Sequence, residues 1–298
     1  MSRLLIVVDM EGISGIERYE QCVRGHPEYE EGVRLLCNEV NVIAETALKS
    51  GARTVSVIDW HGGGGNLDRE KLDSRVEIVP EDLSPGYDLA FLIGFHPMAG
   101  DPAGFISHTM RQGLAVAAHG QQIGELALIA WWLGEHGIPI GLISGDRAAT
   151  SEADRFFPDT PLHTVKRAES WGRAACVPVE QSHEALRTRV ERVFEQPGRW
   201  TVYPPTLPLA FRLKLQRPNP LPGLLPWLEE QSDGWLAGEV ARTRDLIDLI
   251  DVISGMINLQ HRNDYIQALA RDPNVRKRMN QVQQERISQQ IEEGHWSP

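Results

Sequence analysis

The sequence contains few cysteines, and none of them are paired at a spacing typical of a metal or redox motif. Its 298 residues include three cysteines, Cys22, Cys37 and Cys176, and this odd number argues against a disulfide framework. A chain of this length can bury a hydrophobic core without covalent links. We therefore expect a protein of a reducing compartment, the cytoplasm.

Long apolar runs and basic clusters are also absent. The longest apolar stretch, residues 126–133, is far shorter than the roughly 20 residues that span a bilayer. The apolar run at residues 4–8 is too short for a signal peptide and has no cleavage site. With 30 basic and 41 acidic residues, the formal net charge is −11. Because binders of nucleic acids and anionic membranes normally carry a basic face, we expect neither partner.

Common nucleotide-binding and serine-hydrolase motifs are missing. The four glycines at 62–65 do not form G-x-G-x-x-G, and no helical pattern begins there. The chain also lacks a Walker A sequence and the G-x-S-x-G element of serine hydrolases. These absences argue against a dinucleotide site, a P-loop and a serine nucleophile of that type.

Short aliphatic runs alternate with helical patterns through the first two thirds of the chain. A strand followed by a helix implies a crossover connection, which favours a parallel sheet covered on both faces. We expect an α/β fold: a mainly parallel three-layer domain with a smaller C-terminal α/β lobe. The patterns predict strands at 3–9, 54–59, 76–79, 89–94, 114–118 and 138–144, and helices at 28–50, 124–136, 149–157 and 180–194.

A change of composition suggests where the main domain ends. Four prolines interrupt the chain between residues 196 and 208. Beyond them, residues 210–215 alternate like a half-exposed strand, and residues 243–259 have strong helical periodicity. We therefore predict a main domain over 1–196, a smaller lobe over 197–261, and a charged helical tail or oligomer arm over 262–298.

Polar side chains follow several predicted strands at their ends. Because ligands of doubly wound sheets bind beyond the carboxyl ends of the strands, we expect these side chains to converge. Each alone has a structural explanation, such as capping a turn or complementing a helix dipole, but these explanations do not predict convergence. The residues are Asp9 and Glu11 after the first strand, His61 after the second, His96 after the fourth, and Glu125 at the start of the following helix.

Two imidazoles and three carboxylates form a donor set that suits Zn²⁺ or Mn²⁺. Five such side chains can hold two ions if one carboxylate bridges them, and one ion with a nearby free carboxylate is the alternative. A loop rich in glycine and proline at residues 100–104 leads to His108. This histidine is either a surface residue or a group that moves protons at the same site. The pattern makes residues 1–196 the expected metal-binding catalytic domain.

The segments that carry these residues resemble the DppA-type D-aminopeptidase family of dinuclear zinc metallopeptidases. The first predicted strand leads into V-D-M-E-G-I-S-G at residues 8–15, a specific signature. The resemblance extends over roughly residues 3–260. Further matching segments are D-W-H at 59–61, G-F-H at 94–96, S-H-T-M at 107–110, G-E-L at 124–126 and S-G-D at 144–146.

The resemblance implies a role for each candidate residue. Asp9 would bridge two zinc ions, His108 would take the position of the family's catalytic histidine, and the other ligands would be Glu11, His61, His96 and Glu125. The family removes amino-terminal residues from short peptides, including D-amino-acid peptides. It assembles as a homodecamer of two stacked pentameric rings around a channel. The implied activity is that of a zinc-dependent aminopeptidase acting on small peptide or amide substrates.

Two residues near the expected site depart from the family's pattern. Trp60 stands where smaller residues are usual, and Arg147 follows Asp146 where a second acidic residue is frequent. We expect Trp60, Asp146 and Lys166 to contact the substrate. The departures leave two alternatives open: an amidase acting on a small non-peptide amide, and a non-catalytic member of the fold.

Overall fold

A seven-stranded sheet forms the centre of the main domain in the computed structural model, which describes residues 2–84, 86–215 and 228–253. Its strand order is β3-β2-β1-β4-β7-β8-β9. Neighbouring strands are parallel except for the antiparallel pair β8 and β9. The strands are β1 (Ser2–Val8), β2 (Ala52–Asp59), β3 (Val76–Ile78), β4 (Leu89–Phe95), β7 (Ile140–Asp146), β8 (Leu162–Ser170) and β9 (Arg173–Cys176).

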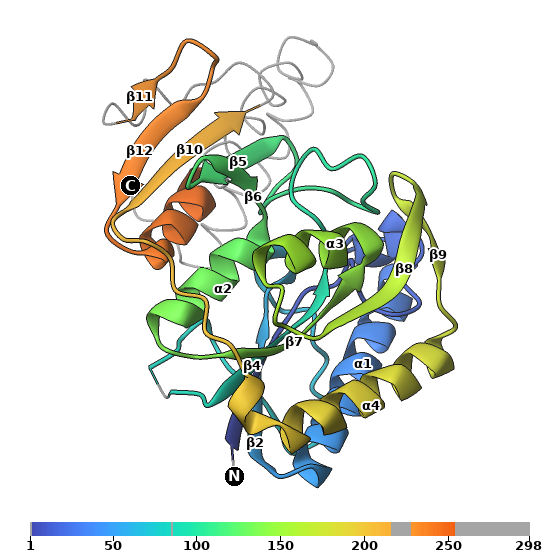
Figure 1. Cartoon of the computed structure of the whole chain (residues 1–298). Helices are drawn as coiled ribbons and strands as arrows, with labels where there is room; N and C mark the ends of the chain where they lie inside the picture. The colour runs from blue at the N-terminus through green and yellow to red at the C-terminus, as the bar shows by residue number, and fades with distance from the viewer. Residues whose placement is uncertain (1, 85, 216–227, 254–298) are drawn as a thin grey trace, which may run out of the picture. The chain divides into compact units, whose positions relative to one another are not determined.

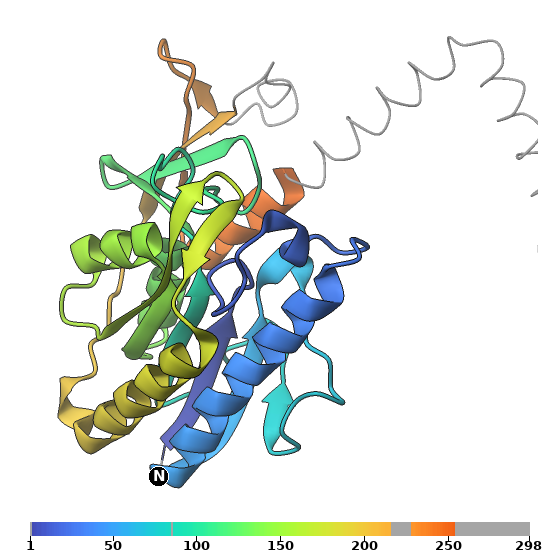
Figure 2. The same cartoon turned by 90° about the vertical axis from the view of Figure 1, so that its right-hand side faces the viewer.

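Helices cover both faces of this sheet, as expected for parallel strands that are buried on both sides. Helices α1 (Tyr29–Lys49) and α4 (Val179–Glu195) lie side by side on one face (Figure 1). Figure 2 shows these helices in front of the strands and α3 (Arg147–Phe156) to the left of them. Helix α2 (Glu125–Glu135) contacts β4 and is almost entirely buried. The predicted mainly parallel α/β fold is confirmed.

The apolar stripe of α1 explains how this helix packs. Its buried residues recur every three or four positions, and they join strand β1 and helix α4 in one hydrophobic cluster. Alternate residues of β1 point into this cluster, because side chains along a strand alternate between its two faces. The cluster includes Val33, Leu36, Val40 and Ile43 of α1, Leu4, Ile6 and Val8 of β1, and Leu186, Val190 and Val193 of α4.

A second sheet is antiparallel and has the order β11-β12-β10-β5-β6. The expectation that residues 114–118 belong to the parallel sheet is wrong. Strand β5 turns back into β6 through His119 and Gly120, both at positive φ (51° and 78°). Such a tight hairpin cannot provide the long crossover that parallel pairing needs. The strands are β5 (Leu114–Ala118), β6 (Gln121–Ile123), β10 (Leu209–Leu215), β11 (Glu229–Glu230) and β12 (Leu236–Val240).

The second sheet combines strands from both sides of the boundary predicted at residue 196, since β10 pairs with β5. Residues 243–253 are helical, which agrees with the beginning of the helix predicted at 243–259. The remainder of that helix and the tail predicted over 262–298 lie outside the described residues. Among the described residues, no helix combines the length and apolar character needed to cross a membrane.

A close backbone approach joins the ends of β1 and β4. The amide of Asp9 donates to the carbonyl of Ile93 at 2.8 Å, and the amide of Gly12 donates to the carbonyl of Gly94 at 2.7 Å. Gly94 has a φ of +77°, and a Cβ added there would lie 2.2 Å from the carbonyl oxygen of Asp9. Only glycine fits this position without moving the backbone that carries Asp9.

The Gly94→Ala variant is therefore expected to lose about 2–5 kcal/mol of unfolding free energy, since left-handed strain and steric overlap add together. Gly137→Ala is the matched control: its φ is +68°, but no atom of the described part of the chain lies within 4 Å of the added Cβ. The control is expected to lose about 1–2 kcal/mol from strain alone. Denaturant unfolding measures both values, and equal losses would show that the contact with Asp9 is unimportant.

Candidate metal centre

The sheet topology places the predicted ligands at one edge. From β1 the strand order runs outward to β2 and β3, and from β4 it runs the other way to β7 and β8. Ligands of doubly wound sheets bind at such a switch point, beyond the carboxyl ends of the strands. Asp9 follows β1 and His96 follows β4, so both stand at the switch point. Glu125 reaches the same place from the start of α2.

The structure brings all five predicted ligands into one cluster with Asp9 at its centre. Nδ1 of His61 lies 3.3 Å from Oδ1 of Asp9 and 2.9 Å from Oε2 of Glu11. Nε2 of His96 lies 3.3 Å from Oδ2 of Asp9 and 3.2 Å from Oε1 of Glu125. Two donor sets, Asp9–Glu11–His61 and Asp9–His96–Glu125, each have their ligand atoms within 4.8 Å of one another. Asp9 belongs to both sets.

The cluster fits a divalent metal by its burial and its donors. Asp9 is only 2% exposed, and its Oδ2 has no hydrogen-bond partner among the described residues. A buried carboxylate oxygen without a partner is costly, and a bound cation offsets that cost. Carboxylates and imidazoles together are the ligands of many zinc sites.

The charges of the cluster act strongly on one another. Burial, and then the charge of Glu11, raises the pKa of Asp9 to about 7. Burial also raises the pKa of Glu11, but the charge and hydrogen bond of His61 outweigh it and hold that pKa well below its usual range. In Glu125 burial is outweighed by the charge of His96, which lowers the pKa to about 2. Of the three crowded carboxylates, Asp9 thus resists ionisation. A divalent cation would supply positive charge that stabilises its ionised form.

Three histidines around the cluster have their orientation fixed by the backbone. In each, one ring nitrogen is hydrogen-bonded to a carbonyl oxygen. Because a carbonyl only accepts, that nitrogen carries a proton, and the other nitrogen faces the cluster, where it can bind a metal once it is deprotonated. The bonds, all 3.0 Å long, join Nε2 of His61 to Cys22, Nδ1 of His96 to Pro97, and Nδ1 of His108 to Ile106.

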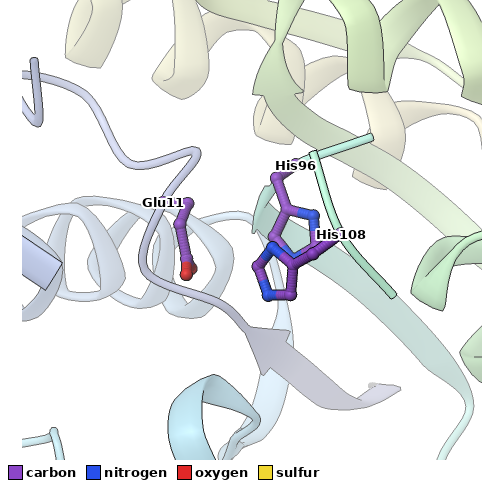
Figure 3. Close-up of side chains that lie close together, drawn as sticks. All are labelled: Glu11, His96 and His108. Atoms are coloured by element: carbon purple, nitrogen blue, oxygen red, sulfur yellow. The ribbon is translucent and has the colours of Figure 1, made fainter. Parts of the chain in front are cut away.

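His108 lies at the border between the cluster and a cavity. Its ring stacks on that of His96 with centroids 3.8 Å apart, and Figure 3 shows the two rings one over the other with Glu11 opposite. Nε2 of His108 is 3.9 Å from Oε1 of Glu125. His108, Glu11 and His61 all line a cavity of about 360 Å³. Burial, and then the charge of His96, lowers the pKa of His108, which favours a neutral imidazole there.

The three residues predicted to contact substrate are buried and are not among the described residues that line this cavity. Nε1 of Trp60 donates to Oε2 of Glu125 at 2.8 Å. Nζ of Lys166 donates to the carbonyls of Glu11 at 2.6 Å and Ile16 at 2.5 Å, at the two ends of one loop. These contacts favour a positioning role for both side chains over direct contact with a substrate.

Asp146, at the start of α3, is also held by hydrogen bonds within the protein. Its Oδ1 accepts from the amide of Ala149, which caps the helix, and its Oδ2 accepts from the amide of Phe105, both at 2.7 Å. The second bond fixes the loop that leads to His108. Arg147, the neighbouring departure from the family pattern, is exposed.

Comparisons with known proteins show the family of the chain. The sequence model of the M55 peptidase family, described as D-aminopeptidase, matches residues 2–221. The chain belongs to this family. A D-aminopeptidase of Bacillus subtilis (strain 168) is 31% identical over 185 residues, which cover 59% of this chain and 67% of that protein. The predicted resemblance and the predicted hydrolase class are confirmed.

A solved structure has the same fold. The Zn-dependent D-aminopeptidase DppA from Bacillus subtilis, described as a self-compartmentalizing protease, superimposes with a TM-score of 0.79. The match covers 85% of this chain and 97% of that chain at 24% sequence identity. At this identity the likeness establishes the fold alone.

One further residue of this family member escaped the sequence analysis. Glu152, in α3, is 1% exposed, and its Oε2 accepts from the amide of Met98 at 2.7 Å. Its Oε1 would be 2.5 Å from a Cβ placed on Gly124. The carboxyl group thus lies between the segment after His96 and the residue before Glu125. The sequence around Glu152 contains no pattern that predicts its position beside these two segments, because a single acidic residue within a helix is common.

Trp60→Phe is expected to weaken zinc binding by about 10- to 100-fold, the usual cost of losing a group that orients a metal ligand. Phenylalanine keeps an aromatic ring but cannot donate to Glu125. Competition with a chelator measures the affinity. Trp171→Phe, at a side chain that is 55% exposed, is the control and should leave the affinity unchanged. Unchanged zinc affinity in Trp60→Phe would reject this role.

Proposed function

We propose that this protein is an aminopeptidase that uses two zinc ions to remove the amino-terminal residue from short peptides, including D-amino-acid peptides. The observation that carries the proposal is the pair of donor sets sharing Asp9. The two oxygens of Asp9 face different sets, one toward His61 and the other toward His96. A bridging carboxylate needs this arrangement. Glu11 and His61 would then complete one ligand shell, and His96 and Glu125 the other.

Zinc is the metal best supported by the donors. Imidazole ligands suit zinc, whereas manganese favours sites richer in oxygen. The structural relative is Zn-dependent, which supports the same choice here, with Mn²⁺ as the alternative. When bound, the two ions supply a water of lowered pKa and polarise the scissile carbonyl group.

The chain itself contributes orientation and proton transfer. His108 lines the cavity beside Glu11, and its Nδ1 is held by the carbonyl of Ile106. Nε2 is therefore the nitrogen that can exchange a proton with a bound substrate. Because Nδ1 holds the proton of the neutral ring, we assign to Nε2 the acceptance of a proton from the attacking water; the resulting imidazolium would then hydrogen-bond the oxyanion or pass that proton to the departing amine.

The protein is also proposed to form a homodecamer of two pentameric rings. The structural relative is a self-compartmentalizing protease, and the family resemblance implies such rings. Sites enclosed in a channel would admit short peptides and exclude folded proteins. Sedimentation is expected to give ten times the chain mass of 33.3 kDa. A monomeric mass at assay concentration would contradict the proposal.

The activity is tested with zinc-loaded protein and a panel of alanyl-alanine stereoisomers beside simple amides. We expect zinc-dependent release of the amino-terminal residue from the dipeptides. Turnover of simple amides without turnover of dipeptides would favour the amidase alternative. One reason for considering the amidase was Arg147 beside the expected site. This arginine is exposed and is not among the described residues lining the cavity, which weakens the case for the amidase. Full activity in zinc-free protein would overturn the mechanism.

A further inference from the structure

Two arginines line the cavity beside the proposed metal centre. Among the described residues of its lining, Arg24 and Arg111 are basic, and Glu11 is the single acidic one. Glu11 is already engaged by His61 and belongs to the metal cluster. The whole chain has a net charge of −11, so composition alone does not explain a basic lining. A cavity with this balance of charges attracts an anionic group.

Arg24 is held in place by a chain of hydrogen bonds from the end of β2. Its Nη2 donates to the carbonyl of Gly64 at 2.7 Å and to Oδ1 of Asn66 at 3.0 Å. Nδ2 of Asn66 in turn donates to Oδ1 of Asp59 at 3.0 Å, and the hydroxyl of Tyr29 donates to Oδ1 of Asn66 at 2.6 Å. Among the described residues, these bonds use only Nη2 and leave the Nη1 edge of the guanidinium for a ligand.

The glycine run at 62–65 borders this arginine. All four glycines have positive φ, at 57°, 81°, 81° and 81°, a conformation that residues with side chains rarely adopt. Gly62 lines the cavity, and a Cβ on Gly65 would lie 3.4 Å from Nη2 of Arg24. Metal binding by His61 alone does not require four such residues. Through the carbonyl of Gly64, the run holds the guanidinium close in the chain to the proposed ligand His61.

Arg111 approaches the cavity from a different loop. It follows Met110, a non-glycine residue with a φ of 59°. The amide of Met110 donates to Oε1 of Glu125 at 2.7 Å. Strained backbone of this kind persists where the surroundings fix it, and it concentrates at functional sites. The strain places Arg111 directly beside the segment that supports a proposed metal ligand.

We propose that Arg24 and Arg111 bind the terminal carboxylate of a short peptide whose scissile bond lies at the metal centre. This inference rests on the proposed function and specifies its substrate class. Guanidinium groups match the planar geometry of a carboxylate and bind it through two parallel hydrogen bonds. The cavity of about 360 Å³ is near the lower end of the range for small-molecule sites. The substrates are dipeptides and tripeptides with a free carboxyl terminus.

The test compares alanyl-alanine with its carboxyl-terminal amide, which has the same shape but no negative charge. Calorimetry on chelator-treated protein measures binding without turnover, and zinc-loaded protein gives kcat/KM for both compounds. We expect the acid to be preferred by about 10- to 100-fold in both measurements, as charged hydrogen bonds imply. In Arg111→Gln and in Arg24→Lys the preference should fall, and in Arg24→Gln/Arg111→Gln it should approach one.

Arg34→Gln is the matched control, because this arginine is on α1, has a side chain that is 54% exposed, and is not among the described cavity residues. It should keep the full preference. Equal binding of acid and amide by the unaltered protein would overturn the inference, as would a preference that survives in the double variant. If zinc-loaded protein cleaves both compounds equally, the carboxylate site is rejected and the aminopeptidase stands. If it cleaves neither but the binding preference holds, the carboxylate site stands and the proposed activity is rejected.

Discussion

Replacing Asp9 by alanine is expected to release both zinc ions and to reduce peptide hydrolysis below detection. Asp9 belongs to both donor sets, and its two oxygens face His61 and His96 separately. No other carboxylate in the described cluster approaches both of these histidines within 4 Å. Without Asp9, each ion would keep two protein ligands and would lose the negative charge between them. Plasma mass spectrometry gives the zinc content, and kcat/KM for alanyl-alanine gives the activity.

Asp9→Asn is the companion variant. It preserves the shape of the side chain, and so separates loss of the bridging charge from a packing defect. We expect it to fold normally and to hold less zinc than the unaltered protein. An Asp9→Ala protein that retains two zinc equivalents and its activity would show that Asp9 is not a bridging ligand.

The second large effect is expected from His108→Ala, which should keep the zinc content but lose about 10²- to 10⁴-fold in kcat, the usual contribution of a general acid or base. His108 is outside the two donor sets that share Asp9, and its Nε2 is 3.9 Å from Glu125. It lines the cavity, where a substrate can reach it. Measurement of kcat and zinc content on the same preparation separates the two effects.

His136→Ala is the control for this variant, because His136 bonds the carbonyl of Trp132 at the end of α2 and is not part of the described metal cluster. An unchanged rate in His108→Ala would reject the catalytic assignment. Loss of zinc together with activity would instead make His108 a ligand, which the donor set Glu11–His96–His108 permits geometrically.

The positions of the metal-cluster residues could be predicted because buried parallel strands are uniformly apolar and end where a polar residue appears. Asp9, His61 and His96 each follow such a run, and the alternation of strands with helices places these ends at one edge. The helix that begins with Glu125 was predictable from its continuous apolar sequence. These features are local, so a single sequence contains them.

The features that the sequence did not predict depend on contacts between distant residues. Strand β5 looks like any other short apolar run, and its membership of the second sheet depends on β10, where Phe211 pairs with Ala118. Trp60 was expected to contact the substrate, but its indole nitrogen donates to Glu125, 65 positions away. Lys166 bonds the carbonyl of Glu11 across 155 positions. Such side-chain directions follow from the assembled fold and leave no pattern in the neighbouring residues.

The most direct test of the central claim is the metal content per chain, measured by plasma mass spectrometry on protein purified without a metal-affinity tag. The shared position of Asp9 between two donor sets predicts about two equivalents of zinc per chain, falling below one in Asp9→Ala. A single equivalent in the unaltered protein, or no bound metal after reconstitution with zinc, would contradict the dinuclear centre.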